Sequence, residues 1–363
     1  MRIAEWSLHF YRLPYWRPVQ WFNSTEDGAV FALLRIVGSD GAVGVAEAPL
    51  KPTWSGVSPR SIAAVLEDLL LPAVQEIDVA DQSAVSRALA RIPENFLAKM
   101  LVDNACWTLR AAAGGEPLWR LLKGQESVEV SWCVTRQPPE AMPREAAQIV
   151  DAHGFRALKI KGGQGIDTDI RALRQIRAAV GDAIAFYVDA NGAYSRTEAA
   201  AYVRAIADEG AKVAEDPCQL HPDQPFAELL ARSPIPVLVD SRCASLEDAA
   251  QFLERGATAL SVKPGRIGIT QARRIAELAA QQGANVCSGM YAESALGTLI
   301  SLQLSGALRE PLVPAEQSFY LMMREQILRE PLQIAAGCVR LPAGNDIAAL
   351  VDWDRVGHHA FQP

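Results

Sequence analysis

The chain has 363 residues, of which 50% are hydrophobic and 21% are charged, a composition that is ordinary for a globular protein. Its formal net charge of −7 and the lack of a Lys/Arg-rich run argue against nucleic acid as a partner. No secretory signal is recognisable and no apolar stretch is long enough to span a bilayer. We therefore expect a cytoplasmic protein without a membrane partner.

Cysteine and histidine spacing argues against a zinc site. The six cysteines include no CxxC pair, and the five histidines form no HExxH or HxH pattern. Reduced, structural thiols are the simplest interpretation. The adjacent His358 and His359 are expected in a solvent-exposed tail, and no histidine is placed for catalysis.

The first 50 residues predict β-strands. Apolar runs at residues 29–37 and 42–48 flank the turn sequence Gly38-Ser39-Asp40-Gly41, which is typical of a hairpin. Helical apolar stripes follow at residues 61–77, 81–90 and 94–122. Together these elements predict a small N-terminal α+β domain, to which we assign residues 1–125.

Two aromatic segments interrupt this pattern. Residues 15–22 and 52–59 carry neither helical nor strand periodicity, and both combine tryptophan with proline. Two interpretations remain open: surface loops whose tryptophans are buried, or a lid that covers a site. The lid hypothesis makes Trp16, Trp21 and Trp54 candidate substrate contacts.

From about residue 128 short apolar runs alternate with alanine-rich amphipathic helices, with a repeat of about 25 residues. Eight runs and seven helices predict an α/β fold with a TIM-type barrel at residues 126–325. Residues 326–363, with one more short strand, are expected to pack back on the first domain. The predicted strands are residues 128–135, 155–161, 184–189, 212–215, 236–240, 258–263, 285–290 and 312–316. The predicted helices are residues 138–153, 167–180, 196–209, 223–232, 246–255, 270–282 and 293–308.

Charged residues end several of these strands, at the face where the active sites of TIM barrels lie. Asp189, Glu215 and Asp240 are 26 and 25 residues apart, and Lys263 follows 23 residues later. A lone Asp at a strand end is usually a helix cap or a turn residue, but four charges in phase indicate one site. Three carboxylates without His or Cys favour Mg²⁺, with Mn²⁺ as the natural substitute.

Two lysines precede this set. Lys159 and Lys161 lie two residues apart on a strand, so both point to the same side. The ammonium of Lys159, the cation and partial burial should lower the pKa of Lys161 and favour its neutral amine. Lys263 should face it across a small-molecule carboxylate substrate. This arrangement predicts abstraction of the proton α to the carboxylate, with the metal stabilising the enediolate.

The constellation resembles the enolase superfamily, specifically its muconate-lactonizing (muconate cycloisomerase) subgroup, over nearly the whole chain. The resemblance rests on Lys159-Ile160-Lys161, Val188-Asp189-Ala190-Asn191, Glu215-Asp216-Pro217, Val239-Asp240 and Val262-Lys263-Pro264-Gly265-Arg266-Ile267-Gly268. It implies a modified (β/α)7β barrel with an N-terminal capping domain, and Mg²⁺ on the three carboxylates. It also implies Lys161 and Lys263 as the acid/base pair, Lys159 tuning Lys161, Asn191 near the substrate, and a homo-oligomer.

Two departures from the family pattern leave the substrate open. Ser241 follows the third ligand where Glu is usual, and Asp216 stands where Gln is common. Glu316, which precedes an apolar stretch, is similar to the cycloisomerase pattern and unlike the Asp-x-Asp of dipeptide epimerases. The sequence after Lys263, and Met290 with Glu293, are instead similar to the synthase and racemase branch. Met290, Glu293 and Glu316 are therefore candidate substrate-binding residues.

A cycloisomerase-type, lactonizing enzyme is the leading hypothesis. A racemase or epimerase of N-substituted amino acids, or a lyase similar to o-succinylbenzoate synthase, is the alternative within the family. A catalytically inactive binding barrel is the alternative from another class. The presence of all three carboxylates and all three lysines speaks against it.

Overall fold

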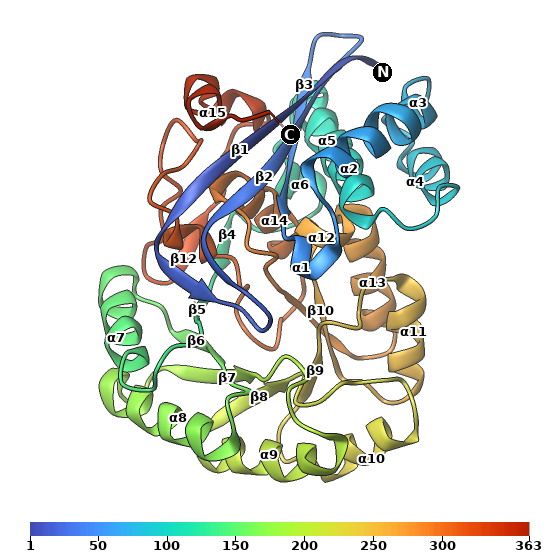
Figure 1. Ribbon diagram of the computed structural model, residues 1–363. Coiled ribbons are helices and arrows are strands. Elements are labelled where there is room, and N and C mark those ends of the chain that lie inside the picture. Colours follow the sequence, from blue (N-terminus) through green and yellow to red (C-terminus); the bar gives the residue numbers. More distant parts are fainter. Residues whose placement is uncertain (363) are drawn as a thin grey trace.

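An antiparallel sheet forms the N-terminal part of the protein in a computed structural model that describes residues 1–362. Its strands are β1 (Ile3–Gln20), β2 (Thr25–Gly38) and β3 (Val43–Leu50), in the order β1-β2-β3 (Figure 1). The predicted hairpin is confirmed, because Val37 of β2 pairs with Val43 of β3.

Helices pack on this sheet and bury its apolar side chains. The longest, α5 (Phe96–Gly114), lies against β3 and β2 and is buried along most of its length. The predicted helix at residues 61–77 is divided by a π-helical segment at Leu66–Leu70. The shorter helices are α2 (Pro59–Val65), α3 (Leu71–Val74), α4 (Gln82–Ala90) and α6 (Leu118–Leu121).

The prediction that residues 15–22 lack regular structure is wrong for most of the segment, because β1 continues to Gln20. The pairing of β1 with β2 shifts register between Pro14 and Val19. Prolines, which have no N–H to donate, interrupt the strand pattern there. The hairpin end of β1 and β2 reaches down toward the parallel strands (Figure 1). The second aromatic segment begins with a one-turn helix, α1 (Pro52–Ser55).

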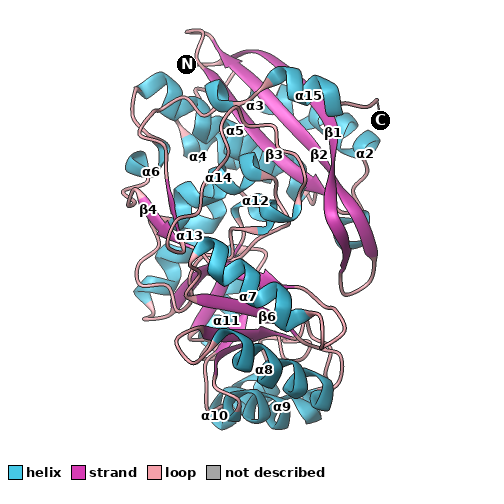
Figure 2. Cartoon of the chain, turned by 90° about the vertical axis from the view of Figure 1, so that its left-hand side faces the viewer, coloured by secondary structure: helices cyan, strands magenta, loops and turns pink. Residues whose placement is uncertain are grey.

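The larger part of the chain is a curled parallel sheet of seven strands, in the order β11-β10-β9-β8-β7-β6-β5. Helices cover its outer side (Figure 2), which confirms the predicted α/β barrel architecture. The strands are β5 (Trp132–Val134), β6 (Ala157–Lys161), β7 (Ala185–Asp189), β8 (Ala211–Glu215), β9 (Val237–Val239), β10 (Ala259–Val262) and β11 (Asn285–Ser288). The helices are α7 (Met142–His153), α8 (Ile166–Val180), α9 (Arg196–Asp208), α10 (Gln224–Arg232), α11 (Leu246–Glu254), α12 (Pro264–Ile267), α13 (Ile269–Gln281) and α14 (Ala295–Ser305).

The predicted eighth strand, residues 312–316, does not form a regular strand. Two prolines in and beside this segment have no N–H to give to a sheet. The segment still bonds to both ends of the open sheet, beside β5 and at the end of β11, and so closes the barrel. The bonds run from Ser131 N–H to Ala315 O (2.9 Å) and from Glu316 N–H to Ser288 O (2.8 Å).

The C-terminal segment contacts both parts of the chain. β12 (Cys338–Arg340) pairs antiparallel with β4 (Ser127–Glu129). α15 (Trp353–His359) lies against β1, as Figure 1 shows, and Ala360 then bridges Tyr11. The domain bounds assigned from the sequence stay a prediction. No helix among residues 1–362 is long and apolar enough to cross a membrane.

Candidate active site

The predicted metal ligands and lysines lie at the carboxyl ends of adjacent strands. In the β6–β7 pairing Lys161 is opposite Asp189, and in the β7–β8 pairing Asp189 is opposite Glu215. Asp240 directly follows β9, and Lys263 directly follows β10. Because the strands are parallel, these ends share one edge of the sheet.

Lys159 is the centre of the buried charges. Its side chain is 1% exposed, and its Nζ lies 2.7 Å from Glu215 Oε1, 2.8 Å from Glu316 Oε2 and 3.0 Å from Asp189 Oδ2. Burial acts to lower the pKa of Lys159, but the three carboxylates outweigh it and hold the pKa well above its ordinary value. Lys159 is therefore a fixed ammonium that ties strand ends together.

Each of the other lysines pairs with a different carboxylate. Lys161 Nζ lies 2.6 Å from Asp189 Oδ2, and Lys263 Nζ lies 2.5 Å from Asp240 Oδ2. Burial acts to raise the pKa of both carboxyl groups, but the neighbouring ammonium groups hold it below its ordinary value. Three strands separate β6 from β10 in the sheet order, so the lysines approach the site from different sides of the curled sheet.

The pKa of Lys161 differs from the expectation drawn from the sequence. Burial acts to lower it, the carboxylate of Asp189 raises it, and Lys159 lowers it, and the net result lies above the ordinary value. The sequence identified burial and the neighbouring ammonium but could not place Asp189 at ion-pair distance. A cation bound by Asp189 would compete with this contribution and favour the neutral amine.

Three carboxylate oxygens at the site are buried without a hydrogen-bond partner. They are Glu215 Oε2, Asp240 Oδ1 and Glu316 Oε1. Buried polar atoms in proteins are nearly always paired, and hard oxygen donors are those that Mg²⁺ and Mn²⁺ prefer. Burial and the charge of Asp189 also raise the pKa of Glu215 well above its ordinary value, which marks an excess of negative charge. The donor set thus fits a divalent cation.

Binding of such a cation requires the side chains to move. Among residues 1–362 only one group brings three His, Cys or carboxylate ligand atoms within 4.8 Å of one another, and it lies elsewhere, at Glu325, His358 and His359. In the barrel, Asp189 is paired with Lys161 and Asp240 with Lys263. A cation would therefore have to displace Lys161 and Lys263 from Asp189 and Asp240.

Asp216, one of the two departures noted in the sequence, fixes the backbone beside Asp240. Its Oδ1 accepts the Asp240 N–H at 3.1 Å, and its Oδ2 accepts the Ser241 N–H at 2.8 Å. Burial and the charge of Asp240 raise the pKa of Asp216 to about 6. Both of its oxygens are thus occupied by the turn that follows β9.

Arg136 is a site residue that sequence reasoning missed. It is 6% exposed, its Nε donates to Gly162 O at 2.8 Å, and its Nη2 donates to Asn191 Oδ1 at 3.3 Å. Asn191 in turn donates to Asp189 Oδ2 at 3.1 Å. Arg136 thereby positions the loops after β6 and β7. Arg136 directly follows the predicted strand at residues 128–135, and this position could have identified it as a site residue.

Trp21 and Trp54 of the predicted lid reach residues of the barrel. Their ring centroids lie 4.9 Å apart in an edge-on contact, and Trp54 lies 5.3 Å from Tyr291. Trp21 also packs on Phe319, at 5.1 Å. Trp16 lies outside this cluster and is 62% exposed. The lid hypothesis stays a prediction, and Trp21 and Trp54 are the tryptophans that it concerns.

Met290 and Glu293 lie in the turn after β11, and both are buried. Glu293 Oε2 accepts the Tyr291 N–H at 2.6 Å. Burial raises the pKa of Glu293 to about 7. Glu293 thus supports the backbone of this turn, next to the tyrosine that contacts Trp54.

The protein thus has an α/β barrel, an N-terminal capping domain, and three carboxylates and three lysines at the strand ends. This combination is typical of one class of barrel enzymes. Residues 141–352 match the family model described as enolase C-terminal domain-like. Residues 9–123 match that of the mandelate racemase / muconate lactonizing enzyme N-terminal domain. The chain belongs to the mandelate racemase / muconate lactonizing enzyme family of the enolase superfamily. It is an enzyme of the isomerase or lyase type found there.

The relatives catalyse different reactions. The chain is 26% identical to muconate cycloisomerase 1 of Rhodococcus opacus, over 95% of this chain and 94% of that protein. It is 27% identical to o-succinylbenzoate synthase of Geobacillus stearothermophilus (88% and 86%) and 28% identical to L-Ala-D/L-Glu epimerase of Clostridium acetobutylicum (82% and 83%). The crystal structure of a muconate lactonizing enzyme from Mycobacterium smegmatis, complexed with muconolactone, matches with a TM-score of 0.94 and 27% identity, over 100% of both chains.

Proposed function

We propose that this protein is a Mg²⁺-dependent, muconate cycloisomerase-like lactonizing enzyme whose Lys161 and Lys263 move a proton at the carbon α to a substrate carboxylate. The observation that carries the proposal is the pair of lysines at the ends of β6 and β10, each held by its own carboxylate. Two separate proton carriers suit a carbon that must exchange a proton on a defined face. Mn²⁺ is the natural substitute for Mg²⁺.

The chain's own residues divide the work. In lactonization one substrate carboxylate adds to a carbon–carbon double bond, and the enediolate of the other carboxylate takes up a proton at its α carbon. The lysine on that face donates the proton, and in the reverse direction its neutral amine removes it. Lys159 is buried among three carboxylates and holds the strand ends instead. Asp189, Glu215 and Asp240 would hold a divalent cation, which would stabilise the negative charge on the substrate oxygens.

Two observations support the cycloisomerase branch. The similarity to a muconate lactonizing enzyme extends over the full length of both chains, and similarity to muconate cycloisomerase 1 covers more of this chain than does similarity to the epimerase. Glu316 also stands in the segment that closes the barrel, where the Asp-x-Asp of dipeptide epimerases is absent. Racemisation of N-substituted amino acids and the o-succinylbenzoate synthase reaction are the second candidates, since those relatives are equally similar in identity.

The test uses EDTA-treated protein, Mg²⁺ and D₂O. With cis,cis-muconate we expect loss of the diene absorbance and a muconolactone that carries one deuterium at the α carbon. The variants Lys161→Ala and Lys263→Ala should each abolish turnover, as should omission of the metal.

Other results of this experiment would favour one of the alternative functions. Deuterium incorporation into an N-acylamino acid or L-Ala-L-Glu, with muconate unchanged, would reject the lactonizing function in favour of a racemase or epimerase. No exchange with any of these acids in the presence of Mg²⁺ or Mn²⁺ would leave a binding barrel as the better description.

A further inference from the structure

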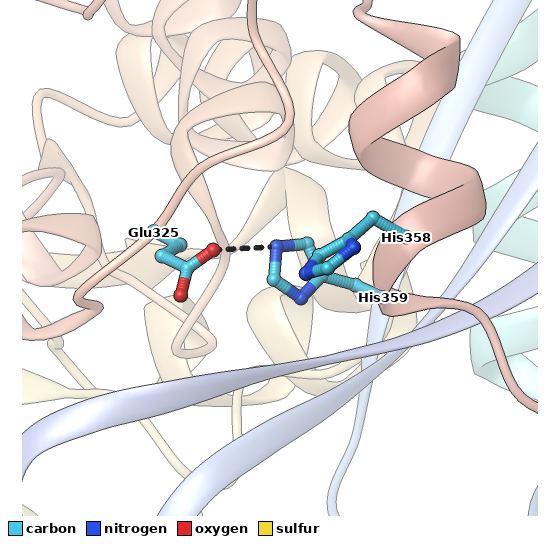
Figure 3. A group of neighbouring side chains, drawn as sticks. All are labelled: Glu325, His358 and His359. Atoms are coloured by element: carbon cyan, nitrogen blue, oxygen red, sulfur yellow. Dashed lines mark ion pairs between the residues drawn. The ribbon is translucent and has the colours of Figure 1, made fainter.

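A second cluster of metal-ligand side chains lies at the C-terminal helix, with donors unlike those of the barrel. Glu325, His358 and His359 each offer one ligand atom, and these three atoms lie within 4.8 Å of one another. Figure 3 shows Glu325 pointing from a neighbouring segment toward the imidazoles of α15. His359 Nε2 lies 2.9 Å from Glu325 Oε2, and the two imidazole centroids are 4.9 Å apart.

We propose that Glu325, His358 and His359 bind a divalent transition-metal ion, with Zn²⁺ as the best match. Two imidazoles and one carboxylate are donors that Zn²⁺ accepts, whereas Mg²⁺ prefers oxygen ligands alone. Zn–ligand distances of about 2.0–2.2 Å at tetrahedral angles place ligand atoms roughly 3.4 Å apart. The three ligand atoms, all within 4.8 Å of one another, would have to adopt this spacing, and a water molecule would complete the coordination.

The surroundings of the cluster admit a cation. The surface hollow that contains it is lined by three carboxylates and two guanidinium groups, so its fixed charge is negative. One of these guanidinium groups, that of Arg355, already lies 3.3 Å from Asp352 Oδ2. The charged residues are Glu325, Asp352, Asp354, Arg324 and Arg355. Glu325 and His358 are exposed, which gives an ion access from solvent.

The cluster lies where a bound ion would link two segments that both contact β1. Met323, two residues before Glu325, bridges Tyr15 of β1, and Ala360, next to His359, bridges Tyr11. An ion held by both segments therefore secures β1 on either side of residues 12–14, just before the strand enters the aromatic segment. We expect Zn²⁺ to stabilise the docking of α15 without taking part in the barrel chemistry.

The test is calorimetric titration of the EDTA-treated, Mg²⁺-saturated protein with Zn²⁺, with thermal unfolding measured in parallel. We expect one Zn²⁺ per chain and a higher Tm. The variants His359→Ala and Glu325→Gln should each weaken binding at least tenfold and lose the Tm shift. His153→Ala, which removes a histidine of α7 on the outside of the barrel, is the matched control and should behave like the wild type.

Co²⁺ provides an independent readout, because tetrahedral Co²⁺ with nitrogen ligands has much more intense visible bands than Co²⁺ in an all-oxygen octahedral site. We expect these bands in the wild type and in Asp240→Asn, and not in His359→Ala. The proposal is wrong if the His359→Ala and Glu325→Gln variants bind Zn²⁺ as the wild type does, or if Asp240→Asn removes the bands. Glu325 is 53% exposed, so its variant keeps the test valid if His359→Ala fails to fold.

Discussion

Lys159→Met tests whether a buried ammonium and a divalent cation neutralise the same carboxylates. Methionine keeps an unbranched side chain of similar length but removes the charge. In the wild type Nζ lies within 3.0 Å of oxygens from Asp189, Glu215 and Glu316, whose side chains are all at most 6% exposed. The variant therefore leaves three buried carboxylates without their common partner.

The expected size of the effect follows from this geometry. Removal of one partner of a buried ion pair costs about 3–5 kcal/mol, because an uncompensated charge remains. The three carboxylates share one ammonium and can take up a proton, so we expect one such loss, about 3–5 kcal/mol of unfolding free energy in EDTA. Saturating Mg²⁺ should restore part of it, since the ion supplies the missing positive charge. The Mg²⁺-induced gain should be larger in the variant than in the wild type.

The assay is urea unfolding in EDTA and in Mg²⁺, followed by circular dichroism. Lys51→Met is the matched control, because Lys51 is equally buried but pairs with Glu26 beside Trp21 and Trp54. It should lose stability to an extent that Mg²⁺ does not alter. A loss below about 1 kcal/mol for Lys159→Met, far under the cost of a broken buried pair, would refute the reasoning. Equal Mg²⁺ responses of the two variants would do the same.

Three further predictions concern other parts of the site. Burial raises the pKa of Glu293 from 4.5 to about 7. The protonated carboxyl group therefore contributes its full stabilisation of the fold below pH 4.5, and this contribution is lost as the pH rises to about 7. In the wild type this loss of unfolding free energy amounts to up to about 3 kcal/mol. Urea unfolding of Glu293→Gln across the same pH range should not show it. If the unfolding free energies of variant and wild type changed with pH in parallel, the raised pKa of Glu293 would be contradicted. Arg136→Lys keeps the charge but not the fork that spans Gly162 and Asn191. Arg136→Lys should lower kcat roughly ten- to a hundredfold. The control Arg144→Lys, at an exposed arginine, should leave kcat unchanged. Trp54→Ala should raise KM for substrate with little change in kcat, and an unchanged KM would reduce Trp54 to a packing residue.

Most of the barrel could be predicted because its signal is local. Each repeat buries one strand on both faces and covers it with one amphipathic helix, so the chain alternates visibly. Asp189, Glu215 and Asp240 recur in phase because each ends or directly follows one strand. Prediction failed where the local sequence pattern was irregular. The prolines of β1 obscured the length of this strand. Residues 312–316 bond to the barrel without forming the regular strand that was predicted.

The partners of the site residues could not be predicted, because they depend on distances between strands. The sequence placed Lys159 beside Lys161 and suggested a lowered pKa for Lys161. Without a bound cation, the 2.6 Å approach of Asp189 instead raises that pKa above its ordinary value. Asp216 looked like an added charge near the metal ligands, yet its oxygens bond to the backbone after β9. Such roles follow from the closed barrel and not from any single segment.

Substrate choice is the property least visible in the sequence, for a related reason. The proposed acid/base residues, Lys161 and Lys263, stand at the ends of strands of one sheet, so one repeating pattern specifies them. The candidate substrate-binding surface is instead assembled from separate segments that meet only in the folded chain: Trp21 packs on Phe319, and Trp54 packs on Tyr291. A change in any one of these segments alters that surface without touching the lysines or the carboxylates. Chemistry and specificity can therefore change independently in this fold, as the cycloisomerase, synthase and epimerase among its relatives indicate.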